Sequence, residues 1–163
     1  MRRRLSALAA VVLVGALLAF YIATPPLPLV EPGEYGTTTV TIADENGTEL
    51  ATVDVRLAET RDQRRIGLSR TDSLDNGTGM LFVHSSTGTH QYHMRNMTIG
   101  LDIVFIDSNG TITAIRDAPR PAVGGTGPYS GSGQYVLEVP RGWMHAVGAT
   151  VGDTVEIPDA VRP

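Results

Sequence analysis

One long apolar segment near the N-terminus constrains this chain more than any other feature of its sequence. Leu5–Ala23 carries no charged side chain, and Ser6 is the only break in the apolar run. As a helix rising about 1.5 Å per residue, it would be about 28 Å long, close to the hydrocarbon thickness of a bilayer. Three arginines at positions 2–4 precede it, and such residues stay on the cytoplasmic side. We therefore expect residues 1–23 to form a single-pass anchor in the cell membrane, with the N-terminus cytoplasmic and the rest of the chain outside.

A cleaved signal peptide is the alternative, and the protein would then be secreted. The apolar run is longer than most signal-peptide cores, and Tyr21 occupies the position two before Ala23 where a cleavage site has a small residue. Residues 24–36 follow with four prolines, and proline-rich chain is extended and fairly stiff. We interpret this segment as a linker to a β-rich domain at residues 37–163.

The charge balance limits the partners of the domain. The chain has 13 basic residues, none of them lysine, and 17 acidic residues, for a net charge of -4. Without the three N-terminal arginines, ten basic residues stand against seventeen acidic ones, for a net charge of -7. An acidic surface repels phosphate backbones, so we expect no nucleic-acid partner. The absence of cysteine from the sequence excludes disulfide bonds and cysteine-bound metals.

Beyond Gly36, short stretches rich in β-branched residues alternate with turn signals. The expected strands are 37–43, 50–57, 79–84, 90–95, 101–107, 111–116, 134–139 and 150–157. One short helix is expected after Thr60, which can cap it with Gln63 as capping-box partner, and Gly67 can end it. These elements predict an all-β fold, a sandwich or small barrel with one short helix.

Two segments of this domain have unusual composition. The expected strand at 101–107 is apolar at odd and even positions alike, apart from Asp102, so we expect it to be central and covered on both faces. Residues 117–133 contain three prolines and five glycines. That composition predicts a long mobile loop, and such loops are often functional.

A series of short motifs runs from about Val53 to Val155. They are Thr60 with Arg64 and Gly67-Leu68, Ser73-Leu74, Gly79-Met80-Leu81-Phe82, Met94 with Asn96, Leu101-Asp102-Ile103 with Phe105-Ile106-Asp107, Gly110, Val136-Leu137-Glu138-Val139 with Gly142, and Gly152-Asp153. In their order and spacing, the chain resembles domain-of-unknown-function family 192, a widespread group of uncharacterised proteins. The resemblance implies a β-sandwich in an exported or membrane-anchored protein, and it implies no activity.

The chain departs from the family pattern at several of these motifs. The family's usual glutamate, methionine, arginine, tryptophan and lysine are replaced by Gln63, Ser69, Thr71, His93 and Arg95. The resemblance therefore supports fold and location more than function.

All four asparagines begin an Asn-x-Thr triplet, which accepts N-linked glycans in exported proteins. They are Asn46, Asn76, Asn96 and Asn109. Three of the four are followed by glycine, and Asn-Gly is also a preferred hairpin turn. Glycan attachment and turn formation are both open, and one surface loop can combine them.

Asp102 is the most informative polar residue, because an unpaired carboxylate in an apolar strand would be costly. One interpretation is a structural ion pair with Arg64, and Arg95 or backbone amides could serve instead. The other interpretation is a carboxylate that contacts a ligand or acts as an acid or base.

A ligand-binding element is predicted directly before the strand at 101–107. Met94, Arg95 and Asn96 bring a guanidinium and an amide that could hold a carboxylate or a sugar, and Asp102 and Glu138 could complete the site. The alternative is a strand end with a capping asparagine.

Two further clusters favour ordinary structural roles. Five arginines, half of the basic residues outside the N-terminal tail, surround the expected helix, and such a cluster is typical of a solvated helix face. They are Arg56, Arg61, Arg64, Arg65 and Arg70. Anionic lipid or an acidic partner is the alternative for this cluster. The histidines, at positions 84, 90, 93 and 145, suit surface or packing roles, so no metal site is predicted. The sequence has no phosphate loop, dinucleotide fingerprint or EF-hand, and no cofactor is predicted.

Three classes of function remain open, and the sequence identifies no catalytic residue. The favoured one is a binding or accessory module outside the membrane, with a small-molecule, envelope or protein ligand between Met94–Asn96, Asp102 and the loop at 117–133. The runner-up is a hydrolase or lyase that uses Asp102 or Glu138 as acid or base on an envelope or sugar substrate, which requires a carboxyl group of raised pKa in a cleft. An adhesion or assembly domain would instead need a flat apolar patch.

Overall fold

The computed structural model describes residues 34–95, 97–121 and 128–163. The predicted anchor at 1–23, the linker up to residue 33, and Asn96 lie outside the described residues. Within the described ranges, no helix has both the length and the apolar composition that crossing a bilayer requires.

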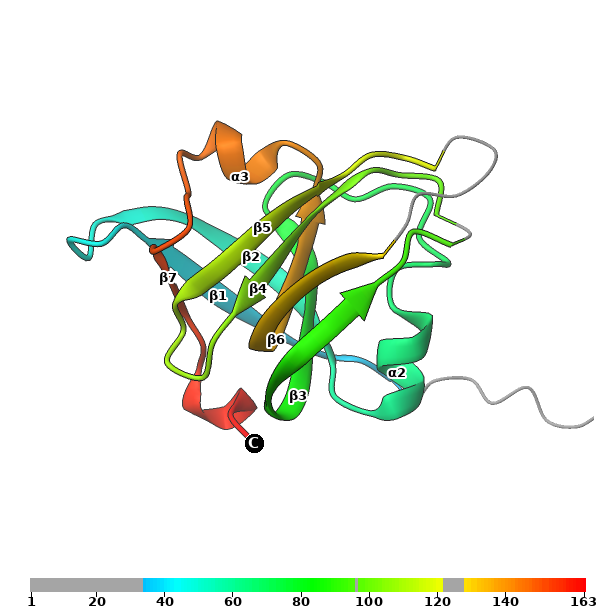
Figure 1. The fold of residues 1–163 in the computed structure, drawn as a ribbon, viewed down its shortest axis with the longest axis horizontal. Coiled ribbons are helices and arrows are strands. Elements are labelled where there is room, and N and C mark those ends of the chain that lie inside the picture. Colours follow the sequence, from blue (N-terminus) through cyan, green and yellow to red (C-terminus); the bar gives the residue numbers. More distant parts are fainter. Residues whose placement is uncertain (1–33, 96, 122–127) are drawn as a thin grey trace, which may run out of the picture. The chain divides into compact units, whose positions relative to one another are not determined.

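A single β-sheet organises the described part of the chain (Figure 1), and its seven strands confirm the all-β prediction. The strands are β1 (Gly36–Ala43), β2 (Glu49–Ala58), β3 (Thr78–Tyr92), β4 (Leu101–Ile106), β5 (Ile112–Ala118), β6 (Tyr129–Pro140) and β7 (Thr154–Glu156). Three short helices accompany them: α2 (Arg61–Ile66), α3 (Trp143–Ala146) and the 3-10 turn η1 (Asp159–Val161). The strand order is β5-β4-β6-β3-β2-β1-β7. Neighbouring strands are antiparallel, except that β2 and β3 are parallel and are connected through α2.

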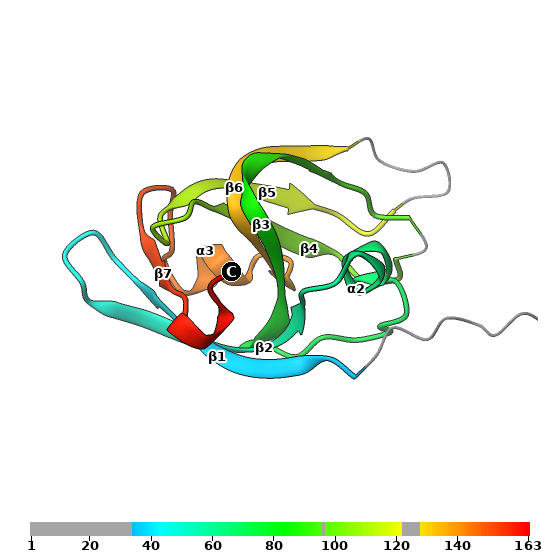
Figure 2. The same cartoon turned by 90° about the horizontal axis from the view of Figure 1, so that it is seen from below.

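The sheet curls until its two edge strands, β5 and β7, meet at one end (Figure 2). Thr111, just before β5, pairs with Thr154 of β7. The amide of Ile112 donates to the carbonyl of Asp153 at 2.8 Å, and the amide of Val155 donates to the carbonyl of Gly110 at 2.7 Å. The result is a half-barrel made from one sheet, instead of the two-sheet sandwich that the family resemblance implied.

Apolar clusters cover both faces of this sheet. One cluster takes buried side chains from all seven strands and from α3, so it fills the interior of the half-barrel, and it includes Val104 and Ile106. The other lies on the outer face and includes Leu101, Ile103 and Phe105. Every residue of β4 is buried, as the apolar pattern on both of its faces predicted. The segment after α2 covers the outer face, whereas α3 covers the inner one.

The structure shortens the predicted loop at 117–133, of which residues 122–127 lie outside the described residues. β5 continues to Ala118, and β6 begins at Tyr129, where residues 129–133 pair with residues 88–92 of β3. Two of the glycines lie within β6 at positions where no larger residue fits. A side chain at Gly131 would overlap the Phe105 ring, and a Cβ at Gly133 would lie 2.5 Å from the carbonyl of Ile106. These paired ends of β3 (88–92) and β6 (129–133) thus pass over the outer face of the sheet at Phe105.

Two smaller predictions were also inaccurate. The expected strand at 150–157 is reduced to β7, because the segment from Thr150 to Asp153 is a turn held by the Asp153 carboxylate, which accepts from the Thr150 amide at 2.7 Å. The single turn of α3 was not predicted, since its four residues are too few to show a helical period.

Candidate functional site

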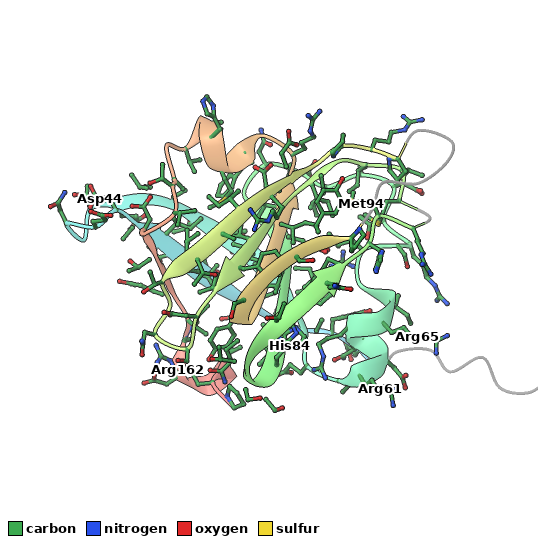
Figure 3. All side chains as sticks on the ribbon, viewed as in Figure 1. Asp44, Arg61, Arg65, His84, Met94 and Arg162 are labelled. Carbon is green, nitrogen blue, oxygen red and sulfur yellow. The ribbon has the colours of Figure 1, made fainter. Side chains whose placement is uncertain are left out.

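A cleft of about 610 Å³ opens on the outer face of the sheet. Its walls come from α2 and the residues just after it, from β3, and from the segment that follows β3. Figure 3 shows Arg61 and Arg65 on α2, His84 on the neighbouring β3, and Met94 beyond the end of that strand. The residues that line the cleft are Arg61, Arg64, Arg65, Ile66, Gly67, Leu68, Ser69, Phe82, His84, His90, Gln91, Tyr92, His93, Met94, Arg95, Met97, Leu101 and Glu138.

Local sequence signals position α2 at the edge of the cleft. The predicted capping box is present: the Gln63 amide donates to the Thr60 hydroxyl at 3.2 Å, and the Gln63 side chain accepts from the Thr60 amide at 3.0 Å. Gly67 follows the helix with φ +50°, and its amide donates to the carbonyl of Gln63. These contacts satisfy backbone groups at both helix ends, so a helix of only six residues holds its arginines in place.

The arginines of α2 have two different roles. Arg64 is half-buried, and its Nη1 donates to the carbonyl of Val83 at 2.8 Å and to that of Glu59. It therefore ties the helix to β3. Arg61 and Arg65 are exposed at the rim of the cleft, as is Arg95 in the segment after β3. These three guanidinium groups are accessible to a ligand.

Glu138 lies at the floor of the cleft with only 6% of its surface exposed. Its neighbours in register are Met80 on β3 and Ile103 on β4, both fully buried in the outer apolar cluster. No described residue forms a hydrogen bond or ion pair with its carboxyl group. Burial alone raises the pKa of Glu138 from 4.5 to about 8, because a charged form without partners is poorly solvated there. At neutral pH the group is therefore mainly a protonated carboxylic acid.

Two titratable groups of β3 in the cleft, His84 and Tyr92, are also mainly uncharged at neutral pH. Burial lowers the pKa of His84 to about 4, and the charges of His90 and Arg64 add to this effect. His84 Nε2 lies 3.1 Å from the hydroxyl of Tyr92. Burial raises the pKa of Tyr92, and the carboxyl of Glu138 acts in the same direction. His84 and His90 stack with ring centroids 3.6 Å apart.

The cleft therefore differs in charge from the rest of the molecule. Four arginines line it, and its only acidic lining residue, Glu138, is mainly neutral. Outside the N-terminal arginines the chain carries a net charge of -7. A concave site with one sign of charge concentrates ions of the opposite sign, so this arrangement favours an anion.

Asp102 lies on the other face of the sheet and does not line the cleft. Its two carboxylate oxygens accept hydrogen bonds from the amides of Gly142 at 2.9 Å and Met144 at 3.0 Å, at the start of α3. The predicted ion pair between Arg64 and Asp102 is therefore not formed, and the backbone amides take its place. Asp102 is only 4% exposed. Because it lies on the opposite face of the sheet, it is also separated from the other predicted ligand-binding residues.

The structure places the remaining predicted residues as follows. Met94, Arg95 and Glu138 come together in the cleft, whereas Asn96 lies outside the described residues. The other three glycan candidates, Asn46, Asn76 and Asn109, are exposed and stand directly before glycines of positive φ. His93 and His145 are exposed, and no three histidine, aspartate or glutamate side chains of the described ranges form a group suited to a metal ion.

Sequence reasoning missed His84, Tyr92 and the rim arginines of α2 as parts of one site. The motif around Glu138 did contain a usable signal, because a single acidic residue stands between Leu137 and Val139 in an apolar strand. The same signal marked Asp102, and only the fold distinguishes their surroundings.

Comparisons with known proteins agree with this fold. A model of the family DUF192, described as uncharacterized ACR, matches residues 41–157. A candidate transcription regulator from Sinorhizobium meliloti 1021 has a similar crystal structure, with TM-score 0.69 and 28% identity over 77% of this chain and 97% of that one. A protein of unknown function from Novosphingobium aromaticivorans DSM 12444 aligns with TM-score 0.68 and 26% identity over 83% of this chain and 94% of that one. No curated protein matches the chain.

Proposed function

The chain belongs to DUF192, a family of uncharacterised proteins, and on this premise we propose that it is a binding module for a small organic anion. The observation that carries the proposal is the pairing of exposed arginines at the rim of the cleft with an unpartnered acid, Glu138, at its floor. Guanidinium groups bind carboxylate and phosphate oxygens in fixed, bidentate geometry. The volume of about 610 Å³ suits a small molecule.

We also propose that this module is held outside the cell membrane. The support is the apolar segment Leu5–Ala23 with arginines at 2–4 before it, which favours an anchor with a cytoplasmic N-terminus. A secreted form after signal cleavage is the alternative. Protease added to intact cells should digest the domain. In untreated cells, the full-length chain should stay in the membrane fraction after an alkaline wash. Recovery of the full-length chain from the cytosol would contradict the anchor.

Two other assignments have less support. The acidic balance of the chain opposes DNA binding, so the regulator description of one structural relative is not carried over. An adhesion domain needs an apolar patch, and Val151 is the one large exposed hydrophobic side chain in the described ranges.

Binding is tested with the full-length chain in detergent micelles. Isothermal titration with acetate, citrate, phosphate and glucuronate at low salt should detect at least one anion, with affinity that weakens at 0.5 M NaCl. The double variant Arg61→Ala/Arg65→Ala should lose roughly tenfold or more in affinity, or about 1.4 kcal/mol. Arg120→Ala removes an exposed arginine outside the cleft and should have no effect. Equal losses in both proteins would point to general charge attraction and would reject the site.

One observation keeps an enzyme as the second candidate. A carboxyl group with a pKa of about 8 in a cleft can act as a general acid near neutral pH. Asp102 cannot share this role, because backbone amides hold it on the other face. Incubation with 4-nitrophenyl esters and glycosides distinguishes the two candidates. Turnover that disappears in Glu138→Gln favours a hydrolase, whereas binding without turnover favours the module.

A further inference from the structure

The polar groups of the cleft are arranged at two depths. The guanidinium groups of Arg61, Arg65 and Arg95 are exposed at the rim. Glu138 is 6% exposed and stands among buried apolar residues of β3, β4 and β6. A ligand that fills the cleft therefore meets positive charge at its outer end and the carboxyl of Glu138 at its inner end, with the paired His84 and Tyr92 side chains in the same lining.

The inner end selects against a second charge. Burying an ionised group without a partner is costly, and no described residue forms a hydrogen bond or ion pair with the Glu138 carboxyl. A protonated carboxyl has an O–H donor that no described residue uses. Leaving a buried donor without an acceptor is unfavourable. An uncharged acceptor oxygen on the ligand satisfies this donor without adding charge.

We propose that the ligand is a hydroxy or oxo organic acid, whose carboxylate meets the rim arginines while an uncharged hydroxyl, carbonyl or ring oxygen accepts a hydrogen bond from Glu138. Uronic acids, which carry uncharged hydroxyl groups away from the carboxylate, belong to this class. This inference rests on the proposed function, because it assigns the chemistry of the anion for the same cleft.

The protonation of Glu138 makes this recognition dependent on pH. The charged and titratable groups that line the cleft with it are Arg61, Arg64 and Arg65 from α2, His84, His90 and Tyr92 from β3, and His93 and Arg95 from the segment after β3. β4 contributes only Leu101 to the lining. Above pH 8 the carboxyl loses its proton, and with it the ability to donate to a ligand oxygen.

The test uses matched ligands with the full-length chain in detergent micelles. Glucuronate is compared with cyclohexanecarboxylate, which keeps the ring and the charge but lacks the other oxygens, and with glucose, which lacks the charge. 6-Hydroxyhexanoate, whose hydroxyl lies at the end opposite the carboxylate, is compared with hexanoate in the same way. At pH 7, at least one oxygenated acid should bind tenfold or more tightly than its matched apolar acid, and glucose should bind more weakly than glucuronate.

Two variants of Glu138 examine the inner contact. Glu138→Gln keeps an N–H donor, so it should keep the preference for the oxygenated acid and should lose none of it between pH 7 and 9.5. The native chain should lose most of that preference over this range. Glu138→Met has similar length and no donor, so both acids of a pair should bind it equally. Near-ultraviolet circular dichroism establishes that each variant is folded.

The outcomes separate this inference from the proposed function. If anions bind and depend on Arg61 and Arg65, but the apolar acids bind as tightly as the oxygenated ones, the anion-binding function stands and the inference is wrong. The same holds if Glu138→Met keeps the preference. If no acid binds the native chain, both are wrong.

Discussion

At the scale of single residues, Asp102 and Glu138 show how surroundings decide the state of a buried acid. They lie on adjacent strands, where Asp102 pairs with Val139 and Glu138 pairs with Ile103, so their side chains point to opposite faces. Two backbone amides at the start of α3 solvate Asp102. Glu138 has no such donors among the described residues, and its pKa rises to about 8. One acid therefore stabilises the fold, and the other remains available to a ligand.

The raised pKa of Glu138 predicts a stability that falls with increasing pH. The folded protein retains this proton up to about pH 8, whereas the unfolded chain releases it near pH 4.5. The free energy of unfolding therefore decreases between these two pH values, by on the order of 5 kcal/mol from this group. Glu138→Gln removes the effect, so the variant should gain stability relative to the native chain as the pH rises.

Urea unfolding at pH 5, 7 and 9, followed by the fluorescence of Trp143, measures this difference. Trp143 is the only tryptophan and is buried, which makes it a reporter of the folded core. Glu156→Gln alters an exposed glutamate and should show no comparable trend. A stability difference for Glu138→Gln that is the same at all three pH values would contradict the prediction.

Asp102→Asn should destabilise the protein without affecting the cleft. The amide side chain has one acceptor oxygen in place of two, so one of the amides of Gly142 and Met144 is left without its partner. We expect a loss of about 2 kcal/mol in urea unfolding at pH 7. Anion affinity should be unchanged because Asp102 lies on the opposite face. A change in affinity with unchanged stability would show that Asp102 serves the ligand instead.

At the scale of elements, α2 is the part of the cleft most dependent on local interactions. A six-residue helix is too short to be stable by itself, and its capping box and the Arg64 contact to Val83 hold it in place. The positions of Arg61 and Arg65 depend on the same contacts.

Thr60→Ala should loosen α2 while the sheet stays folded. Loss of the cap hydroxyl costs about 1 kcal/mol, and the effect should appear as faster hydrogen exchange at the amides of Arg64 and Gly67, which bond to Thr60 and Gln63. Anion affinity should fall because the rim arginines become less ordered. Thr52→Ala on β2, also exposed, is the matched control. Unchanged exchange in α2 would mean that the cap does not limit its stability.

At the scale of the whole domain, the closure of the sheet depends on one close approach. Gly110 has φ +95°, and a Cβ there would lie 2.6 Å from the carbonyl oxygen of Val155. The turn before it follows the pattern Asp-x-Asn-Gly-Thr, in which the Asp107 carboxylate accepts from the amides of Asn109 and Thr111. The same pattern occurs at residues 44–48, where Asp44 accepts from Asn46 and Thr48.

This repetition provides a control for a test of closure. Gly110→Ala introduces both backbone strain and the clash with Val155, whereas Gly47→Ala introduces strain alone, because nothing lies within 4 Å of its Cβ. Strain alone should cost about 1 kcal/mol, and Gly110→Ala should cost at least about 2 kcal/mol more. Hydrogen exchange at the amides of Ile112 and Val155 should rise in Gly110→Ala only. Equal effects of both changes would show that closure contributes little.

The sequence by itself determined the features that arise from neighbouring residues. The capping box at Thr60, the Asn-Gly turns, most of the strands and the two-sided burial of 101–106 follow from side chains a few positions apart, whose spacing the sequence displays directly. The motifs between Val53 and Val155 likewise predicted membership of DUF192, whose family model matches residues 41–157.

Only the tertiary structure decided which distant groups meet. The sequence shows two acids in apolar strands, but their partners are set by the strand register and by the position of α3. Arg61 and Glu138 are far apart in sequence and share a cleft because α2 connects the neighbouring strands β2 and β3, and β6 lies next to β3 in the sheet. Gly131 and Gly133 of the glycine-rich stretch lie in β6, where Gly131 passes over the Phe105 ring. Contacts of this kind depend on the path of the backbone in space, which no local pattern of residues specifies.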